Sequence, residues 1–247
     1  MPSYGVTLLS GGLDSTTVAA YAKGRVDDMS AITFRYGQSH SKEVDCAVRI
    51  AGILGIAHRL LDISFLSEVA WYSALTQPDR FPVPSERAAE EIGHGVPITY
   101  VPMRNTIFVS LAAACLESRV LYAIEVEGVA ASDVAASVYV APNALDYSGY
   151  PDCRPEFYDG IRRTLDLGSK LWTEYAVPIR VETPIIDLSK AEIAALGIRL
   201  GAPLEHTWSC YQGGAAPCAS CDSCVLRAKG FAEAGIPDPL LVRLGGA

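Results

Sequence analysis

The chain reads Ser10-Gly11-Gly12-Leu13-Asp14-Ser15-Thr16 directly after the apolar run at residues 6–9 and before a helix-like stretch that extends through Lys23. A strand that turns through two glycines into the start of a helix is suited to hold phosphate. Gly11 and Gly12 permit dihedrals closed to other residues and let the backbone approach an anion. The N–H groups at the helix start point at the negative charge, and the helix dipole assists them. Ser10, Ser15 and Thr16 add hydroxyl donors, whereas Asp14 is suited to hold Mg²⁺ or to orient the loop.

This loop is neither of the two common phosphate-binding motifs. No Gly-Lys-Ser/Thr follows the glycines, as a Walker A loop requires, and the Gly-x-Gly-x-x-Gly of dinucleotide-binding folds is absent. The loop resembles instead the pyrophosphate-binding loop of the ATP pyrophosphatase superfamily, whose members cleave ATP between the α and β phosphates and use AMP to activate a substrate. An ordinary glycine turn between a strand and a helix is the alternative interpretation.

Strand-like and helix-like patterns alternate over the first third of the chain. Strands are expected at residues 5–9, 30–34 and 58–62, and helices at residues 13–23 and 41–54. This alternation predicts right-handed crossovers and an α/β fold with a Rossmann-like parallel sheet. The resemblance implies helices on both faces, as in adenine nucleotide alpha hydrolases. In such a sheet a ligand lies at the carboxyl ends of the strands, where the glycine loop is placed.

The rest of the chain gives a weaker pattern. Between residues 64 and 97, prolines and glycines interrupt the periodicity, which indicates an excursion from the sheet, either a lid over the site or a surface loop. Ser189 and Glu192 form a predicted capping box at the start of the helix expected at residues 189–200. We expect a single domain over residues 1–247. Further helices are expected at residues 106–117, 156–167 and 189–200, and further strands at 120–126, 137–141 and 177–181.

The composition excludes several classes of protein. Half of the 247 residues are hydrophobic and 19% are charged, as in a well-packed globular chain. The formal net charge of −8 argues against an extended nucleic-acid surface. No apolar run approaches the ~20 residues needed to span a bilayer, and the N-terminus lacks the features of a signal peptide. We therefore expect a soluble, cytoplasmic protein with small-molecule partners and without nucleic-acid or membrane partners.

Four cysteines near the carboxyl end follow the spacing C-x7-C-x2-C-x2-C: Cys210, Cys218, Cys221 and Cys224. Four soft thiolates can close a tetrahedral Zn²⁺ site with no open position, so we expect one structural zinc ion in an embedded segment at residues 205–230. A redox Cys-x-x-Cys pair would leave two of the cysteines unexplained. An iron–sulfur cluster could use four thiolates, but the spacing does not follow the ferredoxin patterns. Cys46 and Cys115 fall on apolar helical patterns and are expected to be packing residues.

Four further segments accompany the glycine loop and the cysteines: TFRYGQSH at residues 33–40, VPMRN at 101–105, DYSGYPDCR at 146–154 and TWSCY at 207–211. Together they resemble the 7-cyano-7-deazaguanine synthase family, over about residues 6–241. The resemblance implies a ligase that converts 7-carboxy-7-deazaguanine, ammonia and ATP into 7-cyano-7-deazaguanine, the nitrile precursor of queuosine and archaeosine. AMP and pyrophosphate are the other products. Mg²⁺ is expected to accompany ATP, and the resemblance also implies a homodimer.

The resemblance assigns roles to particular residues. The expected catalytic residues are Asp14, Ser15, Arg104 and Lys190. ATP is expected at Ser10, Gly11, Gly12, Leu13, Asp14, Ser15 and Thr16, with its adenine edge at the backbone of Thr33 and Phe34. The deazaguanine is expected at Asp146, Tyr147, Ser148, Gly149, Tyr150, Asp152 and Arg154, through ring stacking and hydrogen bonds. The alternatives are a surface ion pair for Arg104 and an exposed helix charge for Lys190. For Cys153 packing is favoured over a nucleophilic role, and the role of His40 stays open.

The chain departs from the family pattern at Arg35, at Ser39 and at Ala141-Pro142-Asn143, and it is longer than that pattern between residues 117 and 138. These departures leave the accepted substrate open. Two other functions also stay open. One is an enzyme that applies the same adenylation to tRNA or to a protein, and the other is a zinc-stabilised ATP-binding adaptor without catalysis.

Overall fold

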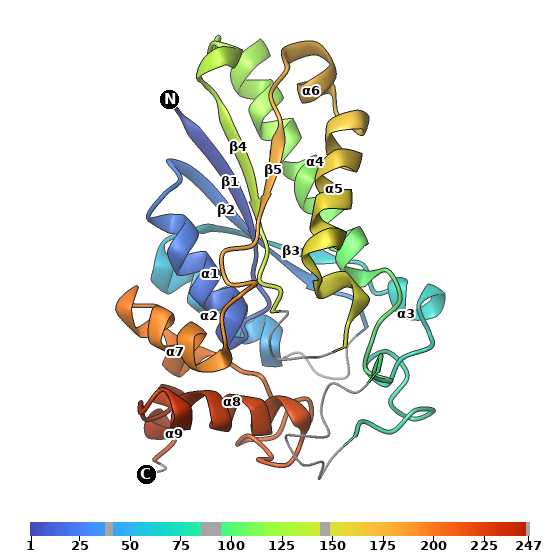
Figure 1. The fold of residues 1–247 in the computed structure, drawn as a ribbon, viewed down its shortest axis with the longest axis vertical. Helices are drawn as coiled ribbons and strands as arrows, with labels where there is room; N and C mark the ends of the chain where they lie inside the picture. Colours follow the sequence, from blue (N-terminus) through green and yellow to red (C-terminus); the bar gives the residue numbers. More distant parts are fainter. Residues whose placement is uncertain (38–41, 85–94, 144–148, 246–247) are drawn as a thin grey trace.

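The structure is a computed structural model that describes residues 1–37, 42–84, 95–143 and 149–245. Its centre is a five-stranded parallel sheet with the strand order β3-β2-β1-β4-β5 (Figure 1). The predicted parallel sheet is confirmed. Its strands are β1 (Ser3–Leu8), β2 (Asp28–Arg35), β3 (Ala57–Asp62), β4 (Ala135–Tyr139) and β5 (Ile179–Glu182).

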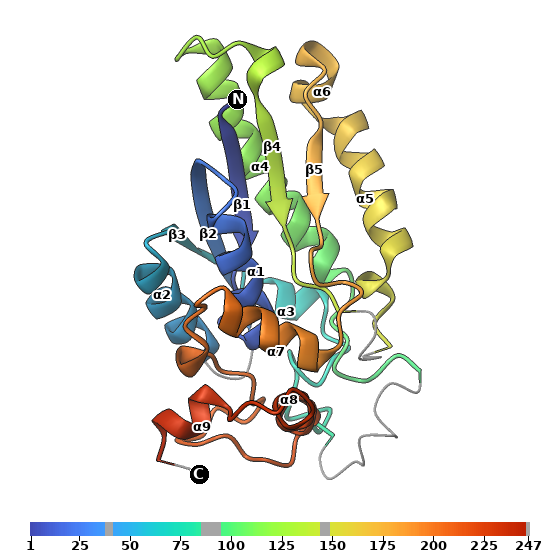
Figure 2. The same cartoon turned by 60° about the vertical axis from the view of Figure 1, so that its left-hand side comes forward.

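Helices cover both faces of the sheet, which confirms the predicted fold class (Figures 1 and 2). One face carries α1 (Leu13–Lys23), α2 (Lys42–Leu54) and α7 (Lys190–Arg199), and the other carries α4 (Arg104–Glu125), α5 (Pro155–Gly168) and α6 (Lys170–Tyr175). The alternation of side chains along a strand explains the two cores. Ala31 of β2 packs with residues of α1 and α2, whereas the next residue, Ile32, packs in the core that includes α4.

The strand order places a ligand site between β1 and β4. The chain leaves β3 at one edge of the sheet and returns as β4 beside β1, so these two strands flank the point where the order reverses. A crevice forms at the carboxyl ends of strands at such a point. The remaining elements are α3 (Leu66–Val69), the 3₁₀ helices η2 (Ala131–Asp133), η3 (Pro151–Cys153) and η4 (Leu204–His206), and α8 (Asp222–Glu233) and α9 (Pro239–Arg243). In Figures 1 and 2, α8 and α9 lie below the carboxyl ends of the strands.

Helix α4 corrects two expectations from the sequence. Residues 120–126 were predicted as a strand because β-branched and aromatic residues are frequent there, but they belong to this 22-residue helix except for its C-cap. Leu116, Val120 and Ala123 continue the helical spacing of its buried face. The sequence was expected to contain no apolar run long enough to span a membrane. Helix α4 is nevertheless long and apolar enough to do so, unlike any other described helix. In this fold its buried face packs on β1 and β4.

The interrupted region after β3 runs outside the sheet, as its lost periodicity predicted. It contains α3, and the N–H of Ala74 donates to the carbonyl of Ile98 at 2.8 Å, which joins the two ends of this region. Residues 85–94, the centre of the predicted lid, lie outside the described residues. The lid therefore stays a prediction.

Gly11 is the point where the glycine loop meets α2. Its φ is +87°, and a Cβ at this position would lie 2.3 Å from the carbonyl oxygen of Glu43 and 2.9 Å from the nitrogen of Ala47. The N–H of Trp208 donates to the carbonyl of Gly11 at 2.8 Å. The missing side chain of Gly11 therefore lets α2 approach the loop, while its carbonyl binds the segment that leads to the cysteines. In this structure Gly11 faces protein backbone on the side where its Cβ would be.

Gly11→Ala is expected to lower the free energy of unfolding by about 2–5 kcal/mol, because the new Cβ combines a strained dihedral with contacts to backbone atoms that cannot move aside. Gly52→Ala is the matched control, since Gly52 lies in α2 with nothing within 4 Å of the added Cβ. That control should raise stability by up to about 1 kcal/mol. Urea unfolding measures both variants, and equal stabilities would contradict the role assigned to Gly11.

Candidate active site

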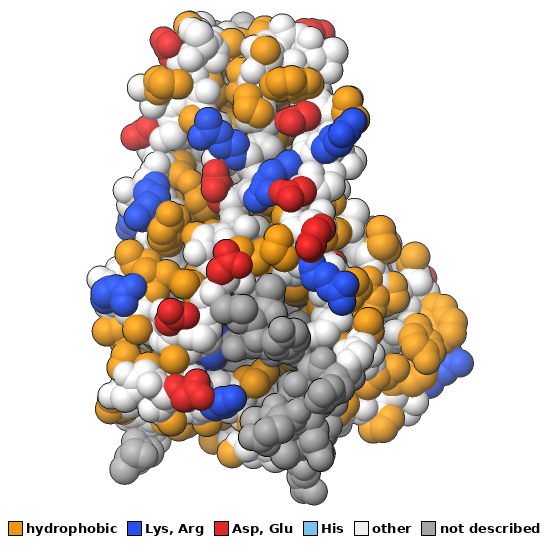
Figure 3. Space-filling view, viewed as in Figure 1, with side chains coloured by type: hydrophobic (Ala, Val, Ile, Leu, Met, Phe, Trp, Pro, Cys, Tyr) orange, Lys and Arg blue, Asp and Glu red, His pale blue; other side chains and the backbone are white. Residues whose placement is uncertain are grey.

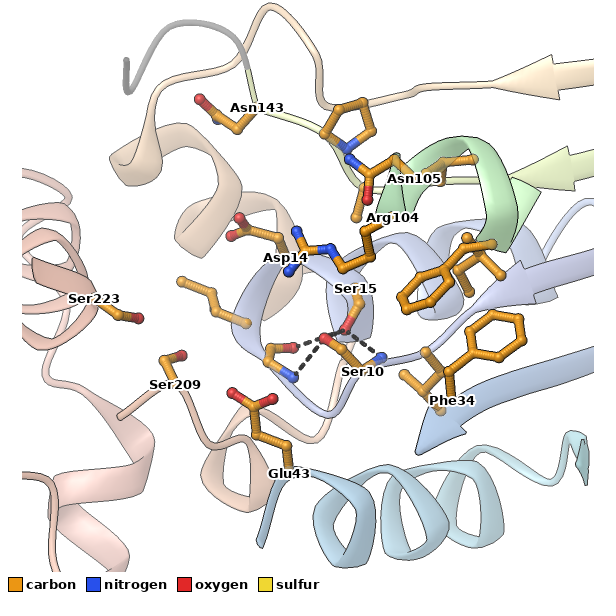
Figure 4. Close-up of a pocket in the computed structure, with 18 of the residues that line it drawn as sticks. Ser10, Asp14, Ser15, Phe34, Glu43, Arg104, Asn105, Asn143, Ser209 and Ser223 are labelled. Carbon is orange, nitrogen blue, oxygen red and sulfur yellow. Dashed lines mark hydrogen bonds between the residues drawn. The ribbon is translucent and has the colours of Figure 1, made fainter. Parts of the chain in front are cut away.

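A cavity of about 390 Å³ opens at the carboxyl ends of β1, β2 and β4, where the strand order reverses (Figure 4). The first turns of α1, α2, α4, α7 and α8 and the residues Trp208, Ser209 and Tyr211 also contribute to its wall. The predicted site residues that line it are Ser10, Gly12, Leu13, Asp14, Ser15, Thr33, Phe34, Arg104, Tyr150 and Lys190. Segments far apart in the sequence therefore converge on one cavity.

Other predicted site residues lie outside this wall. Gly11 and Thr16 are buried within the loop and the start of α1, and Arg154 is exposed at the start of α5. Gly149 and Asp152 are also absent from the residues that line the cavity in the described part of the chain. Asp146, Tyr147 and Ser148 lie outside the described residues, as does His40.

Two serines organise the glycine loop. Their hydroxyl oxygens are 2.9 Å apart, the N–H of Ser10 donates to Ser15 Oγ at 3.2 Å, and the N–H of Gly12 donates to Ser10 Oγ at 3.3 Å (Figure 4). Gly12 is the N-cap of α1 and has no side chain to accept a bond from the first turn. The first N–H groups of a helix have no intrahelical acceptor, so Leu13 and Asp14 begin a helix end that offers donors and a positive dipole to an anion.

Lys190 meets the glycine loop from α7. Its Nζ lies 2.8 Å from Asp14 Oδ2, and the two side chains are 16% and 27% exposed. The predicted capping box holds the start of α7: the N–H of Glu192 donates to Ser189 Oγ, and the N–H of Ser189 donates to Glu192 Oε2. Gly230 of α8 packs on the Lys190 stem, because a Cβ there would lie 2.5 Å from Lys190 Cγ. Lys190 is thus a fixed cation beside the loop and not an exposed helix charge.

Arg104 and Glu43 face the cavity from two other elements (Figure 4). Arg104 is the first residue of α4 and follows Met103, which has a φ of 59°. Its guanidinium carbon lies 6.0 Å from the centroid of the Tyr36 ring. Glu43 lies in the first turn of α2; burial raises the pKa of its carboxyl to about 7, and the charge of Arg104 offsets part of the rise. The cavity thus holds a second carboxylate besides Asp14.

Aromatic rings form another part of the wall. The rings of Phe34 and Phe108 stack with centroids 4.3 Å apart at 23°, and Tyr36 packs edge-on against Phe108. Tyr150 also lines the cavity, with its hydroxyl 2.6 Å from Thr99 Oγ1. These rings give the cavity flat apolar surfaces, which suit a purine-like base.

The region after Tyr150 supports the wall from behind. Asp152 is 5% exposed, burial raises the pKa of its carboxyl, and the N–H of Asn105 donates to its Oδ2 at 3.4 Å. Cys153, for which packing was favoured, lines the cavity, and its Sγ accepts a long 4.0 Å contact from Asn105 Nδ2.

Sequence reasoning missed several side chains of the cavity. Among them are Glu43, Phe108, Tyr158, Ser223 and Arg227. Glu43 and Phe108 each lie in an amphipathic helix, where a residue at the edge of the buried face gives no signal of its own. Tyr36, Ser209 and Tyr211 fall within segments quoted for the family resemblance, so their neighbourhood was marked although no role was assigned to them.

The four predicted metal ligands come together. The Sγ atoms of Cys210, Cys218, Cys221 and Cys224 all lie within 4.8 Å of one another. A tetrahedral zinc site with Zn–S bonds of 2.3 Å has sulfurs about 3.8 Å apart, and the Cys218 and Cys224 sulfurs are 3.9 Å apart. Backbone N–H groups of Gln212 and Cys218 donate to Cys210 Sγ at 3.4 Å, as is suited to a thiolate. The donor set and its spacing therefore fit a tetrahedral metal ion.

The cysteine cluster also touches the glycine loop. Trp208 donates its backbone N–H to Gly11 and its indole Nε1–H to the carbonyl of Cys210 at 2.9 Å. The ammonium of Lys42 lies 3.5 Å from the centroid of the Trp208 ring, and it also donates to the carbonyl of Gly214. One tryptophan thus links the cluster, the loop and α2.

A parallel α/β sheet with a serine- and glycine-rich loop at its switch point is the architecture that the sequence predicted for an ATP pyrophosphatase-like protein. Residues 4–235 match the family described as "Queuosine biosynthesis protein QueC", and the chain belongs to this family. The family predicted from the sequence is therefore confirmed.

Relatives named "7-cyano-7-deazaguanine synthase" cover nearly the whole chain. The one from Thermoplasma acidophilum is 45% identical over 95% of this chain and 90% of its own. Those from Trichodesmium erythraeum and Syntrophus aciditrophicus are each 44% identical, over 96% and 95% of this chain and 99% and 95% of their own.

Cys221→Ser is expected to lose bound metal and stability together, because hydroxyl oxygen is a poor substitute for a thiolate in a four-sulfur site. Cys115→Ser is the control, since Cys115 lies in α4 away from the cluster. Elemental analysis of the purified proteins and their thermal unfolding measure the two effects. Full metal content in a soluble Cys221 variant would remove this residue from the ligand set.

Glu43→Gln is expected to change the pH dependence of stability. The folded-state pKa of Glu43 is about 7 against its usual 4.5, so the folded chain binds this proton more tightly, and stability falls as pH rises between these values. Glutamine cannot ionise and avoids this loss. The variant should match the wild type near pH 4.5 and exceed it by about 1–3 kcal/mol above pH 7. Urea unfolding across this range measures the difference, and a pH-independent difference would contradict the burial of the charge.

Proposed function

We propose that this protein is an ATP-dependent ligase that converts 7-carboxy-7-deazaguanine and ammonia into 7-cyano-7-deazaguanine. The observation that carries the proposal is the 44–45% identity, over nearly the full length, to relatives named for the synthesis of that product. A cavity lined by both the glycine loop and aromatic rings supports it. Nucleotide and base-like substrate fit the two kinds of surface.

The chemistry explains why an ATP pyrophosphatase loop is needed. A carboxylate is a poor electrophile, so its oxygen first attacks the α phosphorus of ATP, and pyrophosphate leaves. Ammonia then attacks the mixed anhydride, AMP leaves, and an amide forms. A second adenylation, on the amide oxygen, allows AMP to leave again and yields the nitrile. In both adenylations negative charge builds on the leaving pyrophosphate, so donors placed there in advance lower the barrier.

The residues of the loop supply those donors. The start of α1, with Ser10 and Ser15, would bind the pyrophosphate, and Lys190 and Arg104 would neutralise its charge. Asp14 would hold Mg²⁺, an oxygen-ligated cation that screens phosphate charge when bound. The backbone of Thr33 and Phe34 at the end of β2 would bind the adenine edge, and Leu13 would pack beside it.

The segment around Tyr150 would bind the deazaguanine. Tyr150 supplies a ring at the cavity, and Gly149, Asp152 and Arg154 flank it. Because the Asp152 carboxyl is buried behind the wall, its hydrogen bond to the Asn105 backbone would position this segment. We propose the same binding role for Asp146, Tyr147 and Ser148 on the family resemblance.

Zinc is the metal that the four thiolates would hold, in an embedded segment at residues 205–230 of one domain that spans the chain. With four sulfur ligands its role would be structural: it would hold Trp208 against the glycine loop.

We also propose a cytoplasmic homodimer that acts on small molecules without binding nucleic acid. The dimer rests on the family resemblance, and the cytoplasm is where ATP is abundant. The surface supports the proposal that the protein does not bind nucleic acid. Basic and acidic side chains are interspersed on the described face in Figure 3, and the net charge is −8.

The test is product analysis after incubation with the acid, ammonium, Mg²⁺ and ATP. Mass spectrometry should show the nitrile, with AMP and pyrophosphate released.

Asp14→Ala should reduce turnover by at least about 100-fold while remaining folded, and Asp45→Ala, an exposed acid in α2, is the control. Turnover with tRNA alone would favour the tRNA-modifying alternative. Tight ATP binding without pyrophosphate release from any acceptor would favour the adaptor.

A further inference from the structure

Two carboxylates line the cavity in the described part of the chain, and their surroundings differ. Asp14 is ion-paired with Lys190 at 2.8 Å. The side chain of Glu43 makes no hydrogen bond or ion pair to another described residue, and its carboxylate faces the cavity in Figure 4. The first is committed to a cation beside the loop, whereas the second is available to a bound molecule.

The backbone holds Glu43 beside the glycine loop. The carbonyl oxygen of Glu43 lies 2.3 Å from where a Cβ of Gly11 would be, so the first turn of α2 rests directly on the loop. Ser10, Gly12 and Glu43 line one continuous cavity, so a molecule bound beside the loop shares that cavity with this carboxylate.

The proposed reaction needs a proton acceptor at nitrogen in its second half. Once the amide oxygen carries AMP, the nitrogen bears two protons and a positive charge. Loss of the first proton gives a neutral imidate. Loss of the second turns the N–H electron pair into the third C–N bond, while the C–O bond breaks and AMP leaves with its electrons. Both protons must go to a base within hydrogen-bond reach of the nitrogen.

We propose that Glu43 is that base: it takes the first nitrogen-bound proton, releases it to solvent, and takes the second as the C–O bond breaks and the nitrile forms. The inference rests on the proposed function. Glu43 acts in the second half of the reaction, whereas the loop and its cations act in both adenylations.

The other groups of the cavity are less suited to this step. Arg104 stays charged and has no proton-accepting site. Burial raises the pKa of the Tyr36 and Tyr211 hydroxyls, so they stay protonated near neutral pH. Asp14 is tied to Lys190. Glu43, whose pKa burial raises to about 7, is a stronger base than an ordinary carboxylate and is still ionised in part at neutral pH.

The experiment compares Glu43→Gln with Asp45→Asn, which removes the same charge from the same turn of α2 at an exposed position. Each variant and the wild type receive the acid, ammonium, Mg²⁺ and ATP, and amide and nitrile are quantified over time. The Gln variant should still form amide at close to the wild-type rate, but its rate of conversion of amide to nitrile should fall at least about 100-fold. Amide should therefore accumulate in this variant alone.

A second assay starts from the amide and varies pH. Wild-type nitrile formation should rise as Glu43 loses its proton, with a midpoint near its pKa of about 7, and Gln should abolish this limb. The charged and titratable groups around Glu43 are Arg104 of α4, Tyr36 after β2, Tyr211 of the cysteine segment, and Lys42, Asp45 and Cys46 of α2. Glu43→Asp, which keeps a carboxylate, should retain the limb at a reduced rate and serves if the Gln variant fails to fold.

The outcomes separate the two proposals. A wild type that makes nitrile together with a Gln variant that makes nitrile equally fast would overturn the role of Glu43 alone. Equal loss of both halves, with a raised Mg²⁺ requirement, would make Glu43 a metal ligand and also overturn it. A wild type that makes no nitrile from either the acid or the amide would overturn the proposed function and this inference with it.

Discussion

The site depends on one close contact, the approach of α2 and of the Trp208 backbone to Gly11. A side chain at Gly11 would occupy the space of the Glu43 carbonyl, and the carbonyl of Gly11 accepts the N–H of Trp208. Through these contacts the loop that follows β1 is clamped between a helix from the first third of the chain and a segment from the last fifth. The clamp fixes the loop before any anion arrives, and preorganised donors are the ones that stabilise charge in a transition state.

The electrostatics of the cavity follow from this assembly. The chain carries a net charge of −8, yet Lys190, Arg104 and the start of α1 all line the cavity. Two carboxylates oppose these cations, and burial gives them different properties. Asp14 keeps a charged partner, whereas the Glu43 carboxyl is desolvated with only the more distant charge of Arg104 to offset it. One cavity therefore presents an ion-paired carboxylate and a desolvated carboxyl at different points.

The cysteine cluster belongs to the same assembly. Its four sulfurs are arranged as in a tetrahedral site, and Trp208 carries their position to the loop through its backbone and its indole. A segment with few large apolar residues thereby gains a fixed shape beside the reactive region. This explains physically why the cysteine cluster lies next to the glycine loop.

The sequence by itself determined the features that depend on local chemistry. The glycine loop, the alternation that predicts a parallel sheet, the capping box at Ser189 and the cysteine spacing each arise from residues close in the chain, where backbone dihedrals, helix caps and ligand geometry set the pattern. Only the tertiary structure decided the rest. Residues 120–126 carry strand-forming side chains, but packing against β1 and β4 keeps them in α4. The role of Gly11 and the place of Glu43 in the cavity depend on contacts between segments distant in sequence, and no local pattern encodes which polar residue of an amphipathic helix will be desolvated by another element.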